Sequence, residues 1–167
     1  MPRPKKQARP TDPNQLAHQT VKKQRRSAHR TQWAAQFAVA SELCKRGYEV
    51  AFTLGNHPLM DLMVISPNRE EFLVDVKGLY KRNYWLVRQQ QPRGRLFYVF
   101  AFVPNDAPNQ FFILTQSQVN EGIQADLEHT RARTRVRGTV LDETHYLSCI
   151  EWNFALRYKD AWGALPK

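Results

Sequence analysis

The fold of this chain is decided by residues 60–77, which read MDLMVISPNREEFLVDVK. Two short apolar segments flank a cluster of turn-forming residues, which is the pattern of a β-hairpin. With the turn centred on Asn68, Asp61 and Asp75 stand directly opposite each other on the paired strands. Opposed residues share a sheet face, with Cβ atoms about 4.5 to 5.5 Å apart. Lys77 points to that same face, because side chains alternate along a strand.

The hairpin therefore predicts a cluster of two carboxylates and one lysine. Two carboxylates this close repel each other unless a cation lies between them, and Mg²⁺ often binds through only one or two protein carboxylates. A neighbouring lysine can orient an attacking water or stabilise negative charge on a phosphate. We expect Mg²⁺ (or Mn²⁺) as the cofactor and phosphodiester hydrolysis as the chemistry. In the alternative, Asp61 and Asp75 are strand-end charges and Lys77 is their ion-pair partner.

Helix and strand patterns alternate around this hairpin. Apolar residues recur with a period of 3.6 and predict a first helix that Ser27 or Thr31 begins and Gly47 ends, with a buried stripe at Trp33, Phe37, Ala40, Leu43 and Cys44. Further strands are expected at residues 48–53, 84–88, 96–103, 111–115 and 146–151, and further helices at residues 116–128 and 154–165. The pattern indicates an α/β domain, with a mixed central β-sheet of consecutive hairpins flanked by helices.

Most of the positive charge lies near the N-terminus. The net charge of the 167 residues is +10, and residues 1–30 hold nine Lys or Arg against Asp12 alone. This segment contains no aromatic residue, so it buries too little apolar surface to offset the entropy of folding. We expect residues 1–27 to form a flexible basic tail and residues 28–167 to form the domain. The tail should attract nucleic-acid phosphates, through residues that include Lys22, Lys23, Arg25 and Arg26.

The same composition argues against membrane and secreted classes. The longest unbroken apolar run, at residues 96–103, has eight residues, whereas a spanning helix needs about 20. The N-terminal segment lacks the apolar region of a secretory signal, and two cysteines do not make a disulfide framework. We therefore expect a cytoplasmic protein with no membrane partner.

The order of these features resembles the PD-(D/E)xK nuclease superfamily, which has the restriction-endonuclease-like fold. The resemblance spans residues 30–115 and rests on a helix ending LCKRGYEV, a strand, the MDL of residues 60–62 and the DVK of residues 75–77. Small uncharacterised bacterial members also have similar aromatic strands. The resemblance implies that Asp61 and Asp75 bind the divalent metal and that Lys77 assists hydrolysis. It also implies DNA as the substrate, and a homodimer, since most such nucleases act as dimers on duplexes.

One position departs from the family pattern. Many members carry a helical Glu twelve residues before the aromatic that follows the helix-ending Gly, and here that position is Gln36. Helical geometry puts Gln36 about 60° from Trp33, at the edge of the buried stripe, where its side chain can reach the metal. A glutamine can ligate through its carbonyl oxygen but adds no charge, so metal affinity should be lower than with Glu. Alternatively, Gln36 is an ordinary polar residue at a helix edge.

Further basic residues are candidates for nucleic-acid contact. Arg88 follows a short aromatic strand, and Arg131, Arg133 and Arg135 alternate in an expected loop or edge segment. The preferred interpretation is a Mg²⁺-dependent DNA endonuclease that uses Asp61, Asp75 and Lys77. Two alternatives remain: a nucleic-acid-binding protein on the same fold that has lost cleavage, and a nucleoprotein or ribosome-associated interaction module that binds through its tail.

Overall fold

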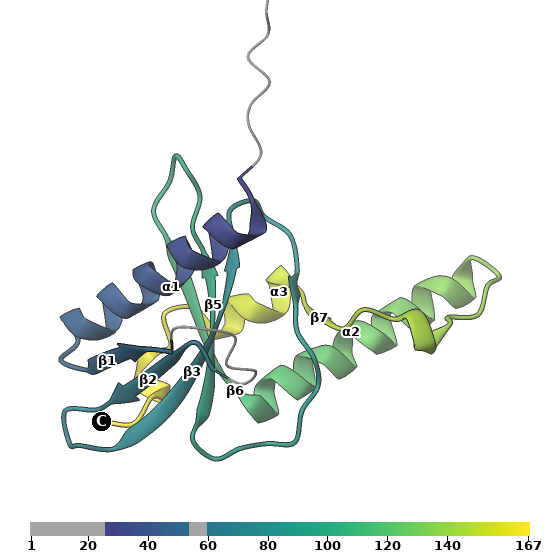
Figure 1. Cartoon of the computed structure of the whole chain (residues 1–167). Coiled ribbons are helices and arrows are strands. Elements are labelled where there is room, and N and C mark those ends of the chain that lie inside the picture. The colour runs from purple at the N-terminus through teal and green to yellow at the C-terminus, as the bar shows by residue number, and fades with distance from the viewer. Residues whose placement is uncertain (1–25, 54–59) are drawn as a thin grey trace, which may run out of the picture.

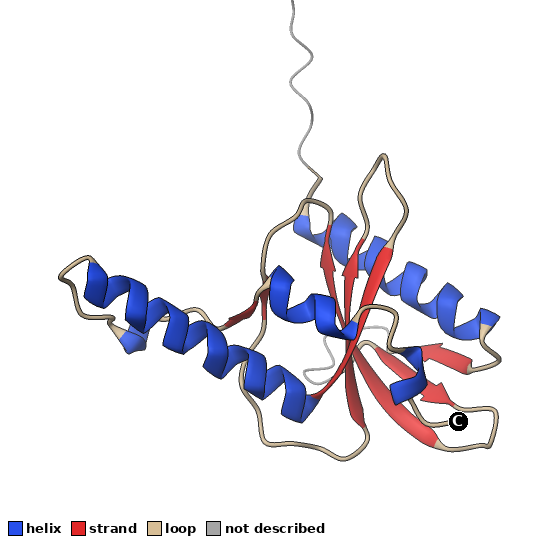
Figure 2. Ribbon diagram, turned by 180° about the vertical axis from the view of Figure 1, so that it is seen from behind, coloured by secondary structure: helices blue, strands red, loops and turns tan. Residues whose placement is uncertain are grey.

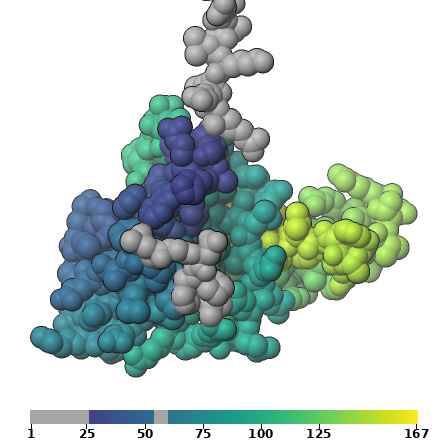
Figure 3. All heavy atoms as spheres, viewed as in Figure 1, coloured from purple at the N-terminus to yellow at the C-terminus, as the bar shows by residue number. Residues whose placement is uncertain are grey.

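A five-stranded sheet forms the centre of the domain, in the order β1-β2-β3-β5-β6 (Figure 1). The computed structural model describes residues 26–53 and 60–167, so most of the predicted tail lies outside the described residues. The strands of the sheet are β1 (Glu49–Phe52), β2 (Leu62–Ile65), β3 (Glu71–Leu79), β5 (Leu96–Phe102) and β6 (Gln110–Thr115). A second, two-stranded sheet pairs β4 (Trp85–Leu86) with β7 (Cys149–Ile150). Segments far apart in the sequence, coloured teal and yellow-green in Figure 3, lie side by side, and β4 pairs with β7 within these parts of the chain.

The β2–β3 hairpin has the register expected for a turn centred on Asn68. Ile65 lies opposite Glu71, and Met63 lies opposite Leu73. The mixed sheet is thus confirmed, but the prediction of consecutive hairpins is wrong, because β3 and β5 run parallel. Parallel strands need a crossover connection, and the chain between β3 and β5 provides it. The predicted strand at residues 84–88 lies in this crossover, where β4 pairs with β7 rather than with the central sheet.

Helices flank the central sheet on both faces (Figure 2). α1 (Ala28–Lys45) covers one face, and α2 (Gln116–Val136) and α3 (Trp152–Ala155) pack against the other. Ser27 caps α1, and Thr115 and Gln118 form a capping box at the start of α2. Short 3-10 helices follow at η2 (Glu143–His145), η3 (Leu156–Tyr158) and η4 (Trp162–Ala164). None of the described helices is long and apolar enough to cross a membrane.

Two predicted helices have different lengths in the structure. α2 continues to Val136, so the alternating arginines 131, 133 and 135 are helical and do not lie in a loop or edge segment. Basic residues in the last turn interact favourably with the helix dipole, and Arg131 pairs with Glu143 at 2.5 Å. The predicted closing helix at residues 154–165 breaks into α3, η3 and η4, because Lys159 forms a β-bridge with β6.

The predicted buried stripe of α1 is confirmed at Ala40 and Leu43, but not at its aromatic residues. The residues that pack against the sheet include Thr31, Ala35, Val39 and Leu43, whereas Phe37 is 57% exposed. Trp33 stacks on Phe37, and Phe37 packs on Phe52 of β1, so the aromatic side chains form a cluster at the edge. The prediction followed the largest apolar side chains, but a helix approaches a sheet most closely along its small residues.

The small stripe of α1 meets a glycine of β3. A Cβ added at Gly78 would lie 2.7 Å from the Cβ of Ala35 and 3.0 Å from the main-chain oxygen of Thr31. Real Cβ atoms essentially never come as close as the first of these distances, and the second would press on helix backbone. Gly78 therefore sets how closely α1 rests on β3.

Gly78→Ala should lower the free energy of unfolding by about 1 to 3 kcal/mol, because the added methyl group overpacks this contact. Chemical denaturation of the purified variant measures the change. Gly94→Ala is the matched control, since an added Cβ there meets nothing within 4 Å. Equal unfolding free energies for the two variants would contradict the close contact.

Candidate active site

Asp75 and Lys77 lie side by side on one face of β3. The Lys77 Nζ is 2.7 Å from the Asp75 Oδ1, and the side chains are 33% and 13% exposed, respectively. The intervening Val76 points to the opposite face and belongs to the core beneath α1. Because side chains alternate along a strand, the charged residues of this segment lie on one face and its core residue lies on the other.

Asp61 lies just before β2 and joins this pair at the sheet edge. Its main-chain N–H donates to the carbonyl of Val74 at 3.0 Å, which extends the hairpin ladder by one residue. Its Oδ2 accepts a hydrogen bond from the main-chain N–H of Val76 at 2.8 Å. The Asp61 carboxylate is thus held against the strand that carries Asp75 and Lys77.

Two glutamines of α1 also donate to Asp61. The Gln36 Nε2 lies 2.5 Å from the Asp61 Oδ1, so the structure brings Gln36 to the position that the sequence indicated. The Gln32 Nε2 lies 3.3 Å from the Asp61 Oδ2 and 2.7 Å from the main-chain oxygen of Val76. The sequence reasoning missed Gln32, although it stands four residues before Gln36 and so on the same helix face.

The environment of Asp75 favours its protonated form. Burial is the largest cause and raises the pKa of Asp75 to about 6; Lys77 lowers it, and the neighbouring Asp61 carboxylate raises it. Tyr98 stands beside Asp75 on β5, and burial together with the Asp75 charge raises the pKa of its phenol to about 12. A buried carboxylate next to a second carboxylate is the arrangement that a divalent cation relieves.

A cavity of about 470 Å³ opens in front of Asp75 and Lys77. Tyr98 and Tyr146 line it, as does Arg88, the arginine that the sequence proposed for nucleic-acid contact. The wall that carries Gln90 is fixed to α2, because the Asn120 Nδ2 donates to the Gln90 main-chain oxygen at 2.8 Å. We call this cavity the catalytic cleft.

None of the other described residues that were predicted to contact nucleic acid lines the catalytic cleft. Lys22, Lys23 and Arg25 lie outside the described residues. Arg26, assigned to the tail, instead donates to the main-chain oxygen of Val103 at 2.7 Å, so it is docked on the domain. Arg131, Arg133 and Arg135 lie on the part of α2 that projects from the body of the domain (Figure 1), and the lining of the catalytic cleft does not include them.

The oxygen donors present fit Mg²⁺ or Mn²⁺ better than Zn²⁺. Within the described residues, no group of three His, Cys, Asp or Glu side chains converges. Mg²⁺ takes one or two carboxylates and keeps several waters. Asp61 and Asp75 would supply the carboxylates, and the Val76 main-chain oxygen lies beside them, within reach of the same Gln32 amide.

Comparisons with models of protein families, with curated proteins and with solved structures give no match to this chain. The functional argument therefore depends on the geometry of Asp61, Asp75, Lys77 and Gln36. Gln36 comes from α1, Asp75 and Lys77 come from β3, and Asp61 lies just before β2; the hairpin register and the α1–β3 contact bring them together.

The metal-free protein should lose stability as the pH rises from about 4 to about 6. In that window native Asp75, with its pKa raised to about 6, still holds a proton that the unfolded chain has released, so the native state binds more protons. Asp75→Asn removes this titration and should reduce the loss by on the order of 2 kcal/mol. Denaturant titrations in EDTA between about pH 4 and pH 6 measure the free energy of unfolding of each protein. Asp106→Asn, on an exposed loop, is the control, and parallel profiles for wild type and Asp75→Asn would contradict the assignment.

Proposed function

We propose that the protein is a Mg²⁺-dependent (or Mn²⁺-dependent) endonuclease of restriction-endonuclease-like fold that hydrolyses phosphodiester bonds in DNA. The observation that carries the proposal is the cluster of Asp61, Asp75 and Lys77, of which Asp75 and Lys77 line the catalytic cleft. Its order along the chain matches the family that the sequence resembles, and the β2–β3 register supports the juxtaposition that this chemistry requires.

The residues divide the work of hydrolysis among themselves. Asp61 and Asp75 would hold the divalent cation, which when bound supplies positive charge to the phosphate and lowers the pKa of a coordinated water. Lys77, one third exposed and in contact with Asp75, is placed to orient the attacking water and to stabilise charge that develops on the phosphate. Gln36 holds Asp61 in position through its amide.

The surroundings of the cleft suit a polyanionic substrate. Arg88 lines the cleft and is exposed, so it can contact a phosphate next to the scissile one. The net charge of +10, most of it in the N-terminal segment, adds attraction that does not depend on sequence. The net positive charge therefore supports the nuclease proposal in addition to the geometry of the site.

One observation favours a second candidate, a nucleic-acid-binding protein without cleavage. Gln36 and Gln32 both donate to Asp61, so its carboxylate oxygens already have partners in this arrangement. With the main-chain N–H of Val76, these amides take up three of the about four lone-pair sites of the Asp61 carboxylate, which leaves little of it for a cation. Nucleic-acid binding that persists in EDTA, combined with no cleavage in Mg²⁺ or Mn²⁺, would choose this candidate.

Asp75→Ala and Lys77→Ala should each reduce cleavage by at least about 100-fold, the usual cost of losing one electrostatic stabiliser. The assay is cleavage of plasmid and oligonucleotide DNA with Mg²⁺ or Mn²⁺. Lys45→Ala is the control for Lys77→Ala, because Lys45 is an exposed lysine in the last turn of α1 and pairs only with Glu42 among the described residues. Wild-type cleavage rates in folded Asp75→Ala protein would refute the assignment.

A further inference from the structure

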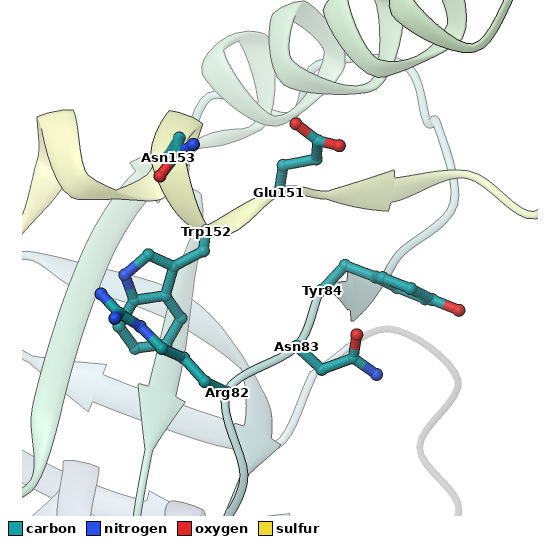
Figure 4. Close-up of a pocket in the computed structure, with 6 residues that line it drawn as sticks. All are labelled: Arg82, Asn83, Tyr84, Glu151, Trp152 and Asn153. Carbon is teal, nitrogen blue, oxygen red and sulfur yellow. The ribbon is translucent and has the colours of Figure 1, made fainter. Parts of the chain in front are cut away.

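A second cavity lies beside the catalytic cleft, between the β3–β4 connection and the start of α3. Its volume is about 430 Å³, within the range of roughly 300 to 1,000 Å³ that is usual for small-molecule sites. Figure 4 shows the side chains that line it: Arg82, Asn83, Tyr84, Glu151, Trp152 and Asn153. None of them belongs to the Asp61, Asp75 and Lys77 cluster.

One wall of this cavity is a stack of flat groups. Trp152 is stacked on the buried Trp85, with ring centroids 5.3 Å apart and an angle of 11° between the planes. The Arg82 guanidinium covers Trp152, with its Cζ 4.4 Å from the ring centroid. An arginine plane supported in this way offers its outer face to another flat group, as arginines that stack on nucleobases do.

The far end of the cavity carries an exposed aromatic side chain. Tyr84 is 48% exposed, although its neighbour Trp85 is buried in the core. In Figure 4, Arg82, Asn83 and Tyr84 lie along one side of the cavity and Glu151, Trp152 and Asn153 along the other, and the Tyr84 ring points away from the Arg82 and Trp152 stack. The strand period explains the contrast, because Trp85 faces inward while Tyr84 and Leu86 face outward.

The polar groups around the cavity are free to bind a ligand. Within the part of the chain that the structure describes, no hydrogen bond joins the side chains of Arg82, Asn83, Tyr84 or Asn153 to another protein group. The Glu151 carboxylate has one weak partner, His129 at 3.8 Å. Two amides, a hydroxyl, a guanidinium and a carboxylate offer both donors and acceptors, as the edges of a nucleobase require.

The charges favour a base over a phosphate. Arg82 contributes one positive charge and Glu151 one negative charge, so the cavity offers no net attraction to an anion. A carboxylate repels phosphate but accepts hydrogen bonds from the amino groups of bases. The flat wall, the exposed tyrosine and the mixed edge groups all fit the same ligand.

The cavity is linked to the catalytic cleft. A smaller cavity of about 250 Å³ shares Tyr84 and Glu151 with the first and Tyr146 and Leu147 with the cleft. Four residues separate Tyr84 from Arg88, which corresponds to at most about 13 Å at 3.3 Å per residue. One strand of nucleic acid can therefore occupy both places.

We propose that the cavity between Arg82 and Tyr84 is a base pocket that holds one unpaired nucleobase of the substrate strand. The place of the pocket along that strand depends on the proposed nuclease function. The pocket makes the substrate a single strand, or a duplex with an unpaired segment beside the bond to be cut, because a paired and stacked base cannot enter it. The base can belong to DNA or to RNA.

Tyr84→Ala should weaken the binding of a short single strand by about 5- to 100-fold, the range for loss of one stacked base. Binding of a blunt duplex of the same sequence should change by less than about 2-fold. Fluorescence anisotropy in EDTA, with labelled single-stranded DNA and RNA in separate arms, measures the affinities without cleavage. The arm that the wild type binds more tightly identifies the preferred sugar, because stacking on a base does not itself distinguish DNA from RNA.

Three further variants separate stacking and hydrogen bonding from effects on folding. Tyr84→Trp keeps an aromatic ring and should retain wild-type binding, whereas Leu156→Ala, at a residue 43% exposed outside the pocket, should change nothing. Asn153→Ala should weaken single-strand binding. It should also change the order of affinity among four single strands that each contain one kind of base. Unchanged single-strand affinity in Tyr84→Ala, equal losses on single strand and duplex, or no single-strand binding by the wild type would each overturn the base pocket.

Wild type and Tyr84→Ala, compared in both the cleavage assay and the binding assay, show whether the base pocket or the nuclease proposal has failed. Cleavage by the wild type in Mg²⁺, with no effect of Tyr84→Ala on single-strand binding, removes the pocket and leaves the nuclease. Tyr84-dependent binding without any cleavage removes the nuclease and leaves the pocket as part of a binding protein.

Discussion

The close contact between α1 and β3 at Gly78 fixes the position of the candidate active site. Because Gly78 has no side chain, the helix rests on the strand through Ala35 and the backbone of Thr31. That distance brings the amides of Gln32 and Gln36 within hydrogen-bonding reach of Asp61. The arrangement of the site is therefore determined by packing between α1 and the sheet, in addition to the chemistry of its polar groups.

The site combines features that do not stabilise the metal-free fold. Asp75 is largely buried beside Asp61, and Lys77 is the one cation among the described residues in contact with it. Buried carboxylates that repel each other in this way are typical of sites where a bound ligand offsets the repulsion. The base pocket has a related character, since it presents an exposed tyrosine and polar groups that the described fold does not use. Under the two proposals, the neighbouring cavities serve one substrate strand, with phosphate chemistry in the cleft and recognition of a base in the pocket.

Local alternation predicted the hairpin of β2 and β3, because it acts over a few residues. The family pattern singled out Gln36, which lies against Asp61 in the structure. The parallel pairing of β3 with β5 could not be read from the sequence, since the short strand at Trp85 has the pattern of a hairpin partner and only tertiary packing directs it to β7. The buried face of α1 was assigned to Phe37, because side-chain size hides the fact that alanines permit closer contact. Gln32 was missed for the same reason, as its role depends on which helix face meets the sheet.

Thermal unfolding of Gln36→Glu with and without divalent cation tests most directly whether the cluster is a metal site. The substitution replaces the amide that donates to Asp61 with a third carboxylate, so the account predicts a lower midpoint than wild type in EDTA and a larger rise on adding Mg²⁺ or Mn²⁺. Gln124→Glu, at an exposed position of α2, controls for the added charge. Identical metal-induced shifts in wild type and Gln36→Glu would contradict the account.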